Sequence, residues 1–131
     1  MKQRKIRVVM AKMGLDSHYR GAVMVSRYLV ERGMDVIYIG NQLPDAIADT
    51  VAQEDAQVLG LSSLSGNHLM MVPRILQRLK EKGLQDIIVI LGGVVPNEEQ
   101  EQLLNAGVSR IFGTGSNLTD IADFIEEQVH L

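Results

Sequence analysis

The chain has 131 residues, of which 46% are hydrophobic and 22% charged, and its formal net charge is −3 at pH 7. This length and balance predict a single globular domain over residues 1–131, and the acidic charge argues against a nucleic-acid partner. The absence of cysteine excludes disulfides and thiolate metal sites, and no stretch is suited to span a membrane or to act as a signal peptide, so we expect a cytoplasmic protein.

Short apolar segments alternate with patterns of helical spacing along the chain. The β-branched, nearly continuous apolar runs predict strands at 6–11, 34–40, 56–62, 86–93 and 108–113. The helices between them are predicted from apolar stripes and from residues typical of helix ends. The first stripe is Ala22, Val25, Leu29 and Val30, ending at Gly33; the second starts at Pro44 and continues with Ile47, Ala48, Val51 and Ala52; the third is Leu69, Val72, Leu76 and Leu79, ending at Gly83. The fourth helix is expected at 98–106, with a cap at Asn97 and an end at Gly107, and the fifth has Leu118, Ile121, Ala122, Ile125 and Val129 after a cap at Asn117. Pro73 lies inside the third stripe, so that helix either starts late or kinks.

Five repeats of strand and helix predict the fold class. Strands that are apolar on both faces and joined by helices indicate a parallel sheet that is covered on both sides. Right-handed crossovers limit the possible topologies. We therefore expect a flavodoxin-like (Rossmann-like) three-layer α/β/α fold, with a five-stranded parallel sheet of order 2-1-3-4-5.

The loops after strands one, three, four and five are the expected functional rim. In such sheets a ligand binds beyond the carboxyl ends of the strands, where the strand order reverses. These loops read KMGLDSHYRG, SSLSGNH, GGVVP and GTGSN, and they hold two of the three histidines. The loops on the opposite side, such as ERGM and EKGLQD, are typical of plain helix ends.

Two common occupants of this fold do not fit the rim. A receiver domain needs an acidic pair after the first strand and an aspartate at the end of the third, where this chain has Ala11, Lys12 and Ser62. A flavin mononucleotide site needs a hydroxyl- and glycine-rich phosphate loop after the first strand, and only one hydroxyl side chain precedes Tyr19 there. The dinucleotide fingerprint G-x-G-x-x-G is also absent from that loop.

Three short motifs occur together on the rim. They are Asp16-x-His18-x-x-Gly21, Ser62-x-Leu64 and Gly92-Gly93, in this order after strands one, three and four. Together they resemble the signature of domains that bind cobalamin in its base-off form, and the resemblance covers essentially the whole chain. The wording of AKMGLDSHYRGA and GLSSLSGNH is most similar to the cobalamin domains of methylmalonyl-CoA mutase and its 2-hydroxyisobutyryl-CoA and isobutyryl-CoA relatives.

The resemblance implies how the cobalt is held. His18 would be its lower axial ligand, in place of the cofactor's own dimethylbenzimidazole. A metal-bound imidazole normally donates its other N–H to an oriented acceptor, and Asp16 matches that role. Lys12 matches a family lysine that pairs with this carboxylate.

The resemblance also implies where the displaced nucleotide tail lies. Gly21, Gly92 and Gly93 would leave room for it beside the sheet. Ser62 would offer its hydroxyl to the benzimidazole nitrogen, and Leu64 would pack nearby. The other residues expected to contact the cofactor are Ser17, Tyr19, Arg20, Gly113 and Gly115.

Two further histidines need an explanation. His68 is the rival imidazole on the same rim, and we expect it to lie at a helix start near the corrin or the partner and not on the cobalt. His130 is expected to be solvated, as are Glu98, Glu99 and Glu101 in a first helical turn.

The resemblance finally implies a function. The chain ends where the cobalamin domain ends and lacks the large barrel that binds acyl-CoA in this family. We therefore expect the small subunit of a split adenosylcobalamin-dependent mutase, an isomerase that rearranges a carbon skeleton by radical chemistry. No catalytic residue is expected on this chain alone, which would be inactive without a large acyl-CoA-binding subunit built on a (β/α)8 barrel.

Three alternatives remain open at this point. A corrinoid carrier for methyl transfer would have a helical cap domain ahead of the first strand, where this chain has only a few residues. A glutamate-mutase-type small subunit shares the motifs, but the segment VVPNEEQEQLLNAGV is closer to the acyl-CoA mutases. A cobalamin-responsive sensor would need a DNA-binding domain. The acyl group of the substrate is not predicted.

Overall fold

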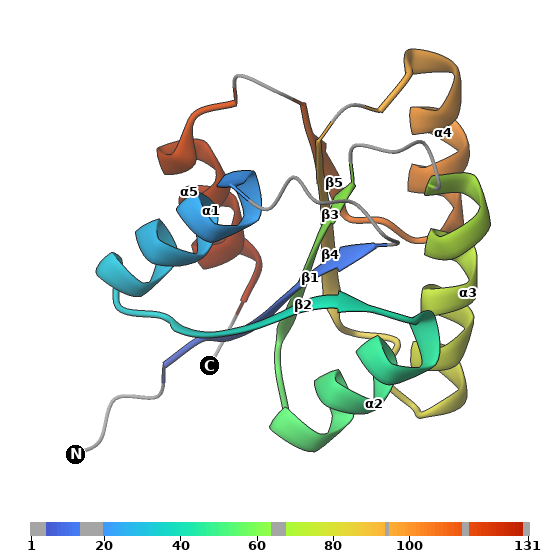
Figure 1. Ribbon diagram of the computed structural model, residues 1–131, viewed down its shortest axis with the longest axis horizontal. Helices are drawn as coiled ribbons and strands as arrows, with labels where there is room; N and C mark the ends of the chain where they lie inside the picture. The colour runs from blue at the N-terminus through green and yellow to red at the C-terminus, as the bar shows by residue number, and fades with distance from the viewer. Residues whose placement is uncertain (1–4, 14–19, 64–67, 94, 114–115, 130–131) are drawn as a thin grey trace.

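The computed structural model describes residues 5–13, 20–63, 68–93, 95–113 and 116–129. The strands are β1 (Arg7–Met13), β2 (Asp35–Gln42), β3 (Val58–Ser63), β4 (Ile88–Gly93) and β5 (Arg110–Phe112), and the helices are α1 (Arg20–Glu31), α2 (Pro44–Glu54), α3 (His68–Glu81), α4 (Asn97–Ala106) and α5 (Leu118–Gln128). The strands form one parallel sheet of order β2-β1-β3-β4-β5. Figure 1 shows α1 and α5 on one face of this sheet and α2, α3 and α4 on the other. The predicted architecture and strand order are confirmed.

The central strands are buried on both faces. Val9 and Leu59 belong to the apolar cluster under α2, α3 and α4, whereas Val8 and Val58 belong to the cluster under α1 and α5. All four side chains are fully buried. This double burial explains why the strand sequences are nearly continuous apolar runs with little alternation.

Polar contacts fasten α1 to α5. The Arg32 guanidinium, just after α1, donates hydrogen bonds to Asp123 Oδ1 at 2.9 Å and to Glu126 Oε1. The hydroxyl of Tyr28 lies 3.2 Å from Thr119 Oγ1, and this hydrogen bond, followed by the one from Arg32, lowers the pKa of Tyr28 below its ordinary value. Such exposed contacts add little stability, but they fix the end of α1 next to α5.

Three side chains that were predicted to face inward are exposed. Val30 is 53% exposed, Leu69 is 41% exposed, and Ala52 is also exposed. Each lies at the margin of its apolar stripe, where a turn of about 100° per residue carries the side chain away from the sheet. Helical spacing thus predicted the buried faces but not their edges.

One helix start differs from expectation, and another excludes one of the two alternatives left open for Pro73. Pro96, and not Asn97, is the N-cap of α4, and Asn97 Oδ1 accepts a hydrogen bond from Gln100 Nε2 at 3.3 Å within the first turn. Helix α3 begins before Pro73 and continues through it, so it does not start late. In the part of the chain that the structure describes, no helix has the length and apolar character needed to cross a membrane.

Two neighbouring leucines of α4 test the burial pattern. Leu103 is fully buried and Leu104 is 45% exposed. Leu103→Ala should lower the free energy of unfolding by about 2–5 kcal/mol, because it leaves a cavity in the core. Leu104→Ala is the matched control and should cost less than about 1 kcal/mol. Urea unfolding followed by circular dichroism measures both, and equal losses would contradict this orientation of α4.

Candidate site at the carboxyl ends of the strands

The carboxyl ends of the strands bring one residue from each strand into a continuous row. The ladder pairs Lys12 of β1 with Asn41 of β2 on one side and with Ser62 of β3 on the other. Ser62 is paired with Gly92 of β4, and Gly92 with Phe112 of β5. We call these five residues the rim row. Three residues predicted for the site, Lys12, Ser62 and Gly92, are therefore neighbours in the sheet.

The rim row belongs to the sheet face that α1 and α5 cover. Met10 and Ile90 lie two residues before Lys12 and Gly92, and both belong to the apolar cluster on that face, as does Phe112. Because side chains alternate along a strand, Lys12 and Gly92 are assigned to the same face. The row thus lies at the open end of the space between α1, α5 and the sheet.

Lys12 is the buried charge of the site. Its side chain is 3% exposed, and Ser26 is the other buried polar residue among those described. Ser26 satisfies its hydroxyl within α1 by donating to the Ala22 carbonyl at 2.7 Å. A buried ammonium is tolerated only where its charge is compensated, so Lys12 marks the rim as a place of charge pairing. Its predicted partner, Asp16, lies outside the described residues.

The rim glycines differ in what the fold requires of them. Gly93 has φ +116°, a conformation that other residues rarely adopt. At Gly92 a side chain could be accommodated. A Cβ there would lie 3.8 Å from the Phe112 carbonyl oxygen and 3.9 Å from that of Leu61, which are ordinary van der Waals contacts. A Cβ at Gly113 would meet nothing within 4 Å. Among the described residues, Gly113 therefore borders open space, and the fold tolerates a methyl group at Gly92.

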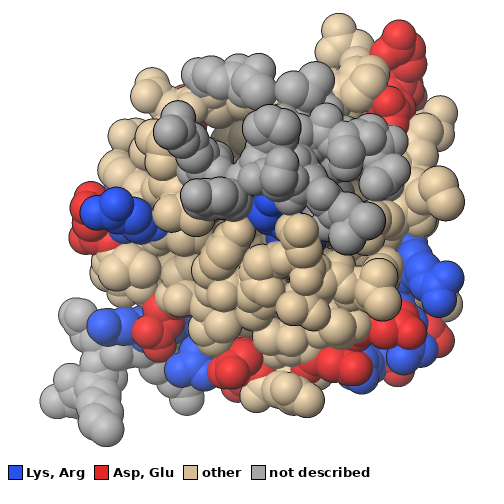
Figure 2. Space-filling view, in the orientation of Figure 1, with Lys and Arg blue, Asp and Glu red and all other residues tan. Residues whose placement is uncertain are grey.

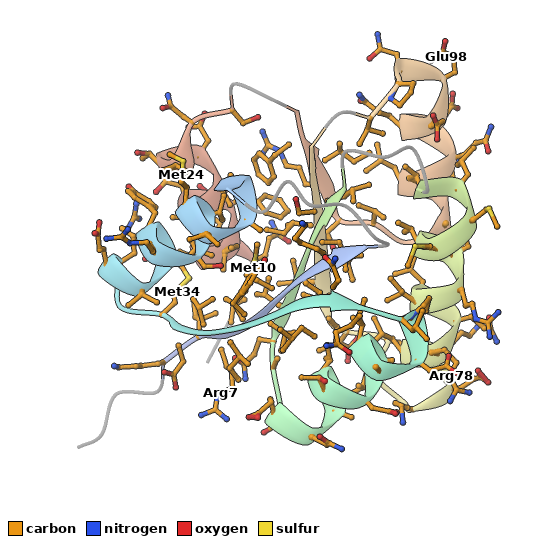
Figure 3. The ribbon with its side chains drawn as sticks, viewed as in Figure 1. Arg7, Met10, Met24, Met34, Arg78 and Glu98 are labelled. Carbon is orange, nitrogen blue, oxygen red and sulfur yellow. The ribbon has the colours of Figure 1, made fainter. Side chains whose placement is uncertain are left out.

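Gly60 continues this small-residue track below the rim, and the sequence analysis missed it. It pairs with Met10 on one side and Ile90 on the other. A Cβ at Gly60 would overlap the Met10 sulfur, and Figure 3 shows Met10 in the interior between α1 and the sheet. A glycine inside a strand-like run is the sequence signal for such a close approach.

An aromatic cluster closes the β5 side of the same face, and it was also missed. The rings of Phe112 and Phe124 meet edge to face, with centroids 6.0 Å apart. The guanidinium of Arg110 lies 5.0 Å from the Phe112 ring centre and 5.4 Å from that of Phe124. The chain has two phenylalanines, Phe112 and Phe124. The rarity of this residue type was the feature of the sequence that could have drawn attention to them.

Several predicted site residues lie outside the described part of the chain. They are Asp16, Ser17, His18, Tyr19, Leu64 and Gly115, together with His130. Arg20 and Gly21 form the start of α1, and His68 is the first residue of α3, but their side chains are not described. The segment 14–19 therefore connects the end of β1, next to the rim row, with the first residue of α1.

The surface in view carries no field of a single sign. Figure 2 shows acidic and basic side chains interspersed around the sides and lower margin, with uncharged residues between them. Ion pairs such as Arg7–Asp35 at 3.3 Å and Arg78–Asp45 at 3.1 Å belong to this mixed pattern. Among the described residues of the site, Lys12 is the buried charge.

Comparison with known sequences assigns most of the chain to one family profile. The family described as B12 binding domain matches residues 6–122. The chain is 46% identical over 112 residues to the 2-hydroxyisobutanoyl-CoA mutase small subunit of Aquincola tertiaricarbonis, covering 85% of this chain and 82% of that one. It is 41% identical over 123 residues to the pivalyl-CoA mutase small subunit of Xanthobacter autotrophicus, covering 93% and 82%. It is 36% identical to human mitochondrial methylmalonyl-CoA mutase, of which it spans 16%.

Solved structures show how widely the fold is shared. A cobalamin-binding protein from Desulfitobacterium hafniense DCB-2 has a TM-score of 0.82 at 25% identity, and the match covers 97% of this chain and 60% of that one. The signal receiver domain of NarL from Mycobacterium tuberculosis has a TM-score of 0.73 at 20% identity, a likeness of fold alone. The rim residues separate the two, because Ala11, Lys12 and Ser62 stand where a receiver needs its carboxylates.

The contrast between two adjacent glycines can be tested directly. Gly93→Ala should lower the free energy of unfolding by about 1–3 kcal/mol, because alanine is strained at its backbone conformation. Gly92→Ala should change it by less than about 0.5 kcal/mol, because the added methyl makes only ordinary contacts. Thermal and urea unfolding measure both variants. A Gly92→Ala loss as large as that of Gly93→Ala would show that the fold itself needs Gly92.

Proposed function

Since the chain belongs to the B12-binding domain family, we propose that it is the cobalamin-binding small subunit of a split acyl-CoA mutase, an isomerase. The observation that carries the proposal is the likeness to two mutase small subunits, each matched over 82% of its own length. The chain spans 17% of the methylmalonyl-CoA mutase of Cereibacter sphaeroides and 16% of the human enzyme, so its likeness to these longer proteins covers a small part of each.

The rim row fits a bulky cofactor whose tail enters beside the sheet. Among the described residues, Gly113 borders open space and no side chain is required at Gly92, and Gly60 extends the small-residue track below them. Ser62 is half-buried in this track, where its hydroxyl can hydrogen-bond the benzimidazole nitrogen. The cofactor we propose is adenosylcobalamin, which when bound supplies the radical chemistry of the carbon-skeleton rearrangement.

The chain's own residues hold and orient this cofactor. His18 would ligate the cobalt, and Asp16 would accept a hydrogen bond from the other nitrogen of its imidazole ring. Lys12, buried beside the start of that loop, compensates the carboxylate charge of Asp16. Such a partner fixes the tautomer and makes the ring a better ligand. The remaining contacts are assigned to Ser17, Tyr19, Arg20, Gly21, Leu64, Gly93 and Gly115.

A larger partner subunit completes the enzyme. We propose that the rim docks onto the carboxyl-terminal mouth of a (β/α)8 barrel, where such barrels hold their active sites, and that the barrel binds the acyl thioester of coenzyme A. Leu43, just after β2, is 75% exposed, and Met70, in the first turn of α3, is 81% exposed. Both follow carboxyl ends of strands, so a partner seated on the rim can cover these apolar side chains.

The cobalt ligand is tested by exchanging the two rim histidines. His18→Ala should weaken cobalamin binding by more than the roughly 10–100-fold that loss of an outer hydrogen-bond partner costs. His68→Ala is the matched control and should bind normally. Protein labelled with ¹⁵N-histidine, loaded with cob(II)alamin, should show ¹⁵N coupling in its electron paramagnetic resonance spectrum. Coupling that persists in His18→Ala and disappears in His68→Ala would reverse the assignment.

Docking is tested with the cognate large subunit. Calorimetric titration should show tighter association when adenosylcobalamin is present, because a ligand that contacts both subunits favours their complex. Leu43→Ser combined with Met70→Ser should weaken association about tenfold or more. Leu104→Ser, equally apolar but on the last turn of α4, is the control. Association indifferent to the cofactor, or acyl-CoA mutase turnover by this chain alone, would refute the small-subunit proposal.

A further inference from the structure

Strand β2 carries one extra residue just before it reaches the rim. The pairing of β1 with β2 runs in step from Arg7 and Asp35 to Met10 and Tyr38, and it resumes with Ala11 opposite Gly40. Ile39 is therefore the extra residue. Gly40, which follows it, has φ +67°, in the left-handed region that favours glycine. Together these residues form a β-bulge.

A side chain of the same strand supports this bulge. Gln42 donates a hydrogen bond from Nε2 to the carbonyl oxygen of Ile39 at 3.2 Å. This bond engages a backbone carbonyl at the place where the ladder is interrupted. The bulge thus combines a glycine in the left-handed conformation with the hydrogen bond from Gln42 to Ile39, and both stabilise it as a regular part of the fold.

The bulge decides which residue of β2 lies beside Lys12. With the extra residue, Asn41 is the ladder partner of Lys12. Without it, Gly40 would occupy that position and Asn41 would lie opposite Met13, facing the other side of the sheet, because a slip of one residue exchanges the faces of a strand. The bulge therefore places a carboxamide in the rim row.

We infer that Asn41 is a cofactor-binding residue, which hydrogen-bonds through its carboxamide to the carboxamide side chains at the edge of the corrin ring. This inference rests on the proposed function. Asn41 is exposed, whereas Lys12 beside it is 3% exposed, so Asn41 is the member of this pair that a ligand on the rim can reach. A carboxamide both donates and accepts hydrogen bonds, which matches a neutral amide partner.

Two corrinoids separate ring recognition from tail recognition. Cobinamide has the ring carboxamides but lacks the nucleotide tail. Asn41→Ala should weaken the binding of cobalamin and of cobinamide by the same factor, about 3–10-fold, the effect of one neutral hydrogen bond. Ser62→Ala should weaken cobalamin alone. Gly40→Val, which disfavours the bulge, should reproduce the loss seen for Asn41→Ala with both ligands.

Controls keep this test specific. Asn105→Ala removes the same exposed side chain from α4 and should bind both corrinoids as the wild type does. Absorbance titration measures binding, and urea unfolding checks that Asn41→Ala is folded under the conditions of the titration. The inference is overturned if Asn41→Ala binds both corrinoids normally, loses affinity for cobalamin alone, or if the wild type binds cobalamin but not cobinamide. A wild type that binds neither corrinoid overturns the proposed function as well.

Discussion

The pairing of β1 with β2 on one side and β3 on the other is the interaction on which the site depends. The chain passes from β2 across β1 to β3, so the order of the strands reverses there and opens a crevice at the carboxyl ends. Lys12 lies at this point, with Asn41 and Ser62 as its ladder neighbours. A slip of β1 by one residue would move the ammonium to the opposite face. Contacts at the start of β1 support its register, because the Arg7 N–H donates to Gln57 Oε1 at 2.7 Å and the Arg7 guanidinium pairs with Asp35 at 3.3 Å.

The two faces of the sheet serve different purposes. The face under α2, α3 and α4 is filled by large buried side chains such as Leu59, Leu91 and Leu103. The other face has Gly60, Ser62 and Gly92 at neighbouring positions and is bordered by α1, whose far end is fastened by exposed polar contacts. Both faces are packed with apolar side chains, but the small residues at the rim end of the second face leave a ligand room there that the first face does not offer. A substitution can then impair binding with little effect on stability.

Much of this arrangement could be predicted from the sequence because the strands are buried on both faces. The runs of β-branched residues and the glycines that end helices, such as Gly33 and Gly107, specified the order of elements and thus the loops of the rim. The rim row could only be placed approximately, because the alternation of a strand does not reveal an extra residue such as Ile39. Asn41 therefore had no signal beyond the preceding glycine. The exposure of Val30 likewise depends on where the sheet ends and not on the spacing within its helix.

The contact between Met10 and Gly60 indicates how the protein can make room for a ligand beside the sheet. The flexible thioether side chain of Met10 occupies the space that a side chain at position 60 would otherwise fill. Rotation of that one side chain releases volume beside the sheet while every ladder hydrogen bond remains in place. Part of the room for a ligand can thus come from rotation of this side chain.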